Sequence, residues 1–117
     1  MTTAPALAST AGGSGIIPAR PLAAQAHALR AAAQFIERTG MEGLSVTADS
    51  HGIHIFVPPS LGGPAIRTAA VMFLAAALGS QPARTQTRAL ALVSADGQIA
   101  GHDACVTTSI YPGEETP

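Results

Sequence analysis

The segment from Pro64 to Leu78 constrains the fold more than any other part of the chain. It contains one charged side chain, Arg67, and one other polar side chain, Thr68. Proline suits the first position of a helix and Gly79 can end one, so the segment is predicted to be helical. A helix that is apolar nearly all round is normally buried on most sides. A chain of 117 residues forms one domain, in which such a helix keeps one side exposed.

The two sides of this predicted helix carry side chains of different size. The side predicted to face the core carries Ile66, Ala70, Phe73 and Ala77. The opposite side carries Ala65, Ala69, Met72 and Ala76. Exposed apolar patches mark contacts between chains, and small residues let two backbones approach closely, so the second side is predicted to be an interaction surface. The alternative is that an alanine-rich surface tolerates water.

Composition excludes several classes of protein. Lys and Arg together number 6 and Asp and Glu number 7, so the chain lacks the basic surface of a duplex-binding protein. The single cysteine, Cys105, excludes an internal disulfide and a cysteine-rich zinc module. No stretch reaches the ~20 apolar residues that cross a bilayer, and the N-terminus does not match a signal peptide. We expect a cytoplasmic protein with no membrane partner.

The remaining elements follow from periodicity and from turn residues. Residues 1–19 are predicted to be a flexible tail, 20–111 a single α+β domain and 112–117 a frayed acidic end. A first helix is predicted from Pro21 to Thr39. Its apolar stripe is predicted to consist of Leu22, Ala26, Leu29, Ala33 and Ile36.

Alternation of apolar and polar residues predicts two hairpins. The first pairs residues 44–49 with 53–57. The second pairs a long strand over 85–94 with a strand over 104–111, through an Asp-Gly turn at 95–98 and a bulge at Gly101. The order α-β-β-α-β-β predicts an α+β fold, with a four-stranded, mostly antiparallel sheet and two helices packed on one face. It leaves the strand order open.

The face of the sheet away from the helices is a second predicted interaction surface. Its residues are small, neutral or aromatic, whereas a solvated sheet face usually carries Lys, Glu or Arg. The residues predicted to make contact are His54, Phe56, Thr107 and Tyr111. The alternation also assigns to this face Thr47, Ala89, Ala91, Val93, Cys105 and Ser109. Candidate occupants are a second sheet, a partner, a ligand or the N-terminal residues.

Nothing in the sequence predicts a catalytic residue or a cofactor. Nucleophile motifs and paired carboxylates are absent, and the chain has no lysine. An alternative metal or enzymatic site would combine His54, His102, Asp103 and Cys105. Zinc accepts nitrogen and sulfur ligands, but this spacing matches no established zinc pattern, so no metal is predicted.

Single-stranded nucleic acid is the other alternative ligand. Phe56 and Tyr111 would stack on bases, and Arg84 and Arg88 would contact phosphates. Two arginines would contact only a short stretch of phosphates, and the net charge of the chain is −1. Nucleic acid is therefore a weaker prediction than a protein partner.

Residues 53–58 and 67–79, with the absence of lysine and the abundance of Ala, Arg, Gly and Pro, resemble small uncharacterised accessory proteins of high-GC actinobacteria. The resemblance covers residues 43–111, is one of style and element order, and implies an accessory role on a mobile element or in regulation. It carries over no site residues. The sequence therefore predicts a small non-catalytic protein-interaction module that forms a homodimer or docks on a partner protein.

Overall fold

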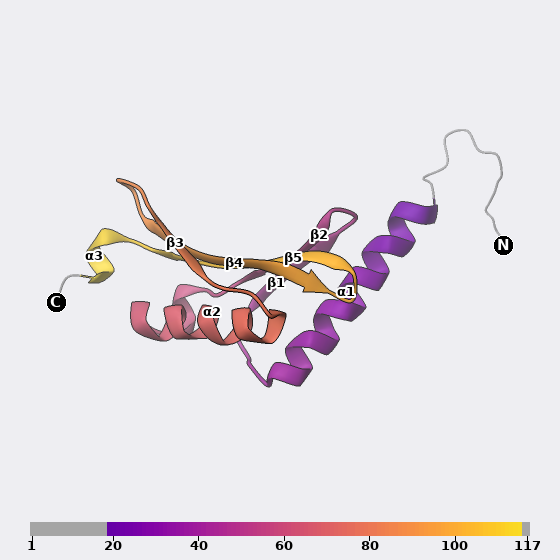
Figure 1. The fold of residues 1–117 in the computed structure, drawn as a ribbon, viewed down its shortest axis with the longest axis horizontal. Helices are drawn as coiled ribbons and strands as arrows, with labels where there is room; N and C mark the ends of the chain where they lie inside the picture. The colour runs from indigo at the N-terminus through magenta and orange to yellow at the C-terminus, as the bar shows by residue number, and fades with distance from the viewer. Residues whose placement is uncertain (1–18, 116–117) are drawn as a thin grey trace.

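The computed structural model describes residues 19–115, so the predictions for residues 1–18 and 116–117 lie outside the described part. Two long helices cover one face of a five-stranded sheet (Figure 1). The helices are α1 (Ala19–Thr39), α2 (Pro64–Leu78), the short 3-10 helix η1 (Pro59–Leu61) and the short α3 (Pro112–Glu115). The strands are β1 (Ser45–Asp49), β2 (Gly52–Phe56), β3 (Ala83–Gln86), β4 (Ala91–Ile99) and β5 (His102–Ile110).

The strands lie in the order β1-β2-β5-β4-β3, with β5 at the centre. Neighbouring strands are antiparallel except β2 and β5, which run parallel. Parallel strands need a long crossover, and here η1, α2 and the β3–β4 hairpin supply it. The predicted α+β class is confirmed, whereas the predicted count of four strands is wrong.

The fifth strand arises because the strand predicted over 85–94 is two strands. Between them Thr87 donates its backbone N–H to the carbonyl of Leu90 at 2.9 Å, and its Oγ1 accepts the Leu90 N–H at 3.1 Å. A threonine side chain can hold a turn in this way without glycine or proline. Because of this turn, the side chains of β4 point to the opposite face of the sheet from the one predicted. Ala91 and Val93 are therefore buried and do not lie on the open face.

The second hairpin turns four residues later than predicted. Asp96 and Gly97 lie within β4, and the chain reverses at Ala100 and Gly101, whose φ angles are 51° and 84°. Positive φ at both positions is the requirement of a type I′ turn, so Gly101 belongs to the turn and not to a bulge. Gly97 serves packing instead, because a Cβ there would lie 3.1 Å from Cβ of Leu78 in α2.

Both helices are rotated relative to the predicted orientation. In α1 the buried side is Ala28, Ala31, Ala32 and Phe35. Leu29 is 47% exposed and Ala33 is also exposed, contrary to the predicted stripe. In α2 the buried apolar residues are Ala70, Val71, Leu74 and Ala75. Ile66 and Phe73 point outward, so the predicted core side of this helix is wrong at its two largest residues.

Candidate functional site

Among the residues whose burial the structure describes, Arg67 is the one buried charged side chain, and it fixes the orientation of α2. Its side chain is 1% exposed and donates to the carbonyls of Gly62 at 2.7 Å and Ser109 at 3.1 Å. Nε also donates to Oγ1 of Thr108, whose own hydroxyl donates to the Val57 carbonyl. These bonds join the start of α2 to β5 and to the end of β2.

Glu114 completes this network from α3. Nη2 of Arg67 lies 2.8 Å and 2.9 Å from its two carboxylate oxygens, and the backbone N–H of Tyr111 donates to the same carboxylate. The Tyr111 N–H and the Arg67 guanidinium hold the pKa of Glu114 below its ordinary value. The end predicted to be frayed is therefore tied to the domain as far as Glu114, because a buried guanidinium needs a carboxylate partner.

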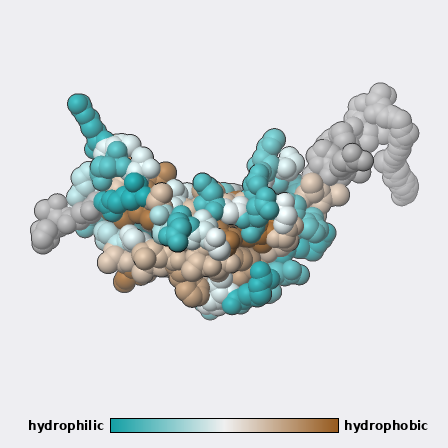
Figure 2. Space-filling view, in the orientation of Figure 1, coloured by the Kyte–Doolittle hydropathy of each residue, from teal (hydrophilic) through white to brown (hydrophobic). Residues whose placement is uncertain are grey.

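With Arg67 turned inward, α2 presents an uncharged outer strip to solvent. Ile66, Met72 and Phe73 are 57%, 55% and 51% exposed. The strip consists of Ala65, Ile66, Ala69, Met72, Phe73, Ala76 and Ala77, all exposed. Figure 2 shows this as a tan and brown band along the side of the molecule formed by α2. The four helix residues of the predicted interaction surface lie within it, together with Ile66, Phe73 and Ala77, which were predicted to face the core.

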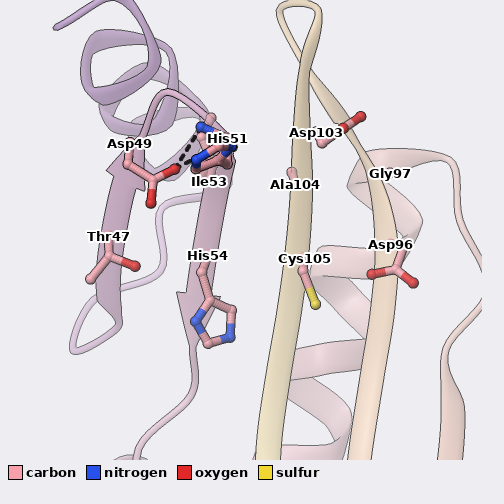
Figure 3. A pocket seen from close by; sticks show the side chains of 11 residues that line it. Thr47, Asp49, His51, Ile53, His54, Asp96, Gly97, Asp103, Ala104 and Cys105 are labelled. Atoms are coloured by element: carbon pink, nitrogen blue, oxygen red, sulfur yellow. Dashed lines mark hydrogen bonds between the residues drawn. The ribbon is translucent and has the colours of Figure 1, made fainter. Parts of the chain in front are cut away.

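The open face of the sheet carries a polar row across four strands. Strand register places Thr47, His54, Cys105 and Asp96 side by side on β1, β2, β5 and β4. They line a shallow pocket of about 440 Å³ near the strand ends (Figure 3). Asp49 and Asp103 also line it, and their carboxylates accept hydrogen bonds from neighbouring groups.

The surroundings of the Cys105 thiol in this pocket disfavour the reactive thiolate form. Burial, together with the hydrogen bond and the negative charge of Asp96, raises the pKa of Cys105 to about 11. A nucleophilic cysteine needs the opposite surroundings, a positive neighbour that favours the thiolate. The neighbouring His54 hydrogen-bonds Oγ1 of Thr107 through its Nε2 at 2.9 Å.

The alternative metal cluster does not assemble. His54, Asp103 and Cys105 belong to the open face, whereas His102 pairs in register with the buried Ile99 and so belongs to the helix side. There its Nε2 hydrogen-bonds Nδ1 of His27 on α1. Within residues 19–115, no group of three or more His, Cys, Asp or Glu side chains is placed to hold a metal ion.

The other predicted contact residues of the open face differ in accessibility. His54 is exposed and Tyr111 is 50% exposed, but Phe56 is half-buried and Thr107 is only 9% exposed. The carboxylates of the pocket occupy the face that would receive a nucleic acid, where they would repel phosphates. The strip on α2 is thus the more accessible apolar surface.

No protein family, no curated protein and no solved structure matches this chain. Among the described helices, none is long and apolar enough to span a membrane.

Proposed function

We propose that this chain is a small non-catalytic protein-interaction module that docks another protein chain through the outer strip of α2. The observation that carries the proposal is the half-exposure of Ile66, Met72 and Phe73 on one uncharged helix side. Isolated exposed apolar residues are ordinary on protein surfaces, but a contiguous patch marks a contact site.

The size of the strip supports the same conclusion. A large side chain carries on the order of 150–250 Å² of surface, so three at half-exposure leave roughly 300 Å² uncovered. The exposed alanines between them bring the strip to about 500 Å², which is near the upper end for the largest patch of a monomer. An alanine-rich side alone would tolerate water, but these three larger side chains dominate the strip.

The test compares wild type with Met72→Glu, which places a charge at the centre of the strip. Met72 is 55% exposed, so the variant is expected to fold with an unchanged melting temperature. Gln34→Glu, which adds the same charge at an exposed position of α1, is the matched control.

We expect Met72→Glu to lose binding in two measurements, capture of proteins by the immobilised chain and mass in solution by light scattering. Gln34→Glu is expected to behave as wild type in both. If all three proteins give the same captured set and the same mass at every concentration, the strip is not a docking surface and the proposal is wrong.

A further inference from the structure

We infer that the partner of this strip is a second copy of the chain, with the two α2 helices packed antiparallel about a two-fold axis between Ala69 and Met72. The inference rests on the proposed docking role of α2 and specifies the partner. Three properties of the strip carry it: its spacing, its distribution of small and large residues, and its area.

Four of the seven strip residues have the spacing of a helix-to-helix seam. Ala65, Ala69, Met72 and Ala76 follow one another at intervals of four, three and four residues. This is the 3.5-residue period of residues that interlock with a facing helix, narrower than the stripe of a helix that packs on a sheet. The occupant is therefore expected to be a helix of similar length, and a second α2 satisfies that requirement.

The side chains of the strip are complementary to themselves in the antiparallel direction. An axis between Ala69 and Met72 sets each Met72 against the partner's Ala69, and each Ala65 against the partner's Ala76. A long, adaptable thioether then fills the space that an alanine leaves. A parallel pair would instead set Met72 against the partner's Met72, with no alanine opposite the thioether.

The charge and area of the strip agree with a weak symmetric dimer. The strip has no charged residue, so two copies approach without repulsion, and no charge on it selects a different partner. About 500 Å² from each copy gives a total near 1,000 Å², the lower end of specific interfaces. We therefore expect dissociation in the micromolar range and a rising mass with concentration.

Disulfide cross-linking tests the direction as well as the existence of the pair. In a Cys105→Ser background, whose altered residue lies on the open face of the sheet, Ala65→Cys and Ala76→Cys are prepared separately, one carrying a mass tag. In the antiparallel pair these two positions face each other, whereas two copies of position 65 lie about 16 Å apart at 1.5 Å per residue. That separation exceeds the ~7 Å limit for a disulfide.

Oxidation of the mixture is expected to give the mixed dimer, and oxidation of either variant alone to give at least tenfold less product. Adding Met72→Glu to both variants is expected to abolish the mixed product. A cross-link in Ala65→Cys alone would overturn the antiparallel arrangement. A strictly monomeric wild type at millimolar concentration would overturn the second copy as partner, while Met72-dependent capture of another protein would leave the docking role standing.

Discussion

Removing the Arg67 side chain is the most informative single perturbation of this fold. The guanidinium donates to two backbone carbonyls, to a buried hydroxyl and to the carboxylate of Glu114. In Arg67→Ala those carbonyls lose their donor, and a cavity opens between α2 and β5. Each buried polar group left without a partner costs about 1–3 kcal/mol, so the two carbonyls together with the cavity give a loss of about 3–5 kcal/mol.

That cost is a large part of the total stability. Single domains unfold with about 5–15 kcal/mol, and in a domain of this size each kcal/mol shifts the melting temperature by about 4–8 °C. We therefore expect Arg67→Ala to melt at least about 12 °C below wild type. Arg67→Lys keeps the charge but not the planar fork of donors, so it is expected to lose roughly half as much.

Urea unfolding followed by circular dichroism measures these differences. Arg88→Ala, at an exposed position of the β3–β4 turn, is the control and is expected to lie within about 0.5 kcal/mol of wild type. If Arg67→Ala and Arg67→Lys both lie within about 1 kcal/mol of wild type, the network does not hold α2 in place and the account of its orientation is refuted.

Three further predictions test other contacts. Cys105 is expected to react with iodoacetamide at pH 8 about 100-fold more slowly in the folded chain than in urea, because its pKa is about 11, and Asp96→Asn is expected to speed the folded reaction. Equal folded and unfolded rates would contradict the stated surroundings of the thiol. Ala100→Asn is expected to stabilise the domain by about 1 kcal/mol in urea unfolding, since asparagine tolerates the positive φ of a type I′ turn. Because the pKa of Glu114 is lowered from its ordinary value of 4.5, its pairing stabilises the fold above pH 4.5, and this stability is lost as the pH falls through the lowered pKa. The urea midpoints of wild type and Glu114→Gln should therefore converge in acid. A difference between the midpoints that stays constant with pH would argue against the pairing.

The local pattern of the chain determined most of the elements. Pro64 and Gly79 mark the bounds of α2, and alternation located β1, β2 and most of β5. These signals act between near neighbours, so they are readable without the fold. The β3–β4 turn was missed because a threonine side chain, and not a glycine, holds it.

The tertiary structure decided which way each element faces. Segment 64–78 is apolar on nearly every side, so its periodicity cannot choose between Ile66 and Leu74 for the core. The choice depends on Arg67, whose hydrogen bonds reach Ser109 and Glu114, more than forty residues away in the chain. By itself the sequence determined that a helix with surplus apolar surface exists, because composition and period are local properties. Which of its sides meets solvent depends on long-range partners that appear only once the chain has folded.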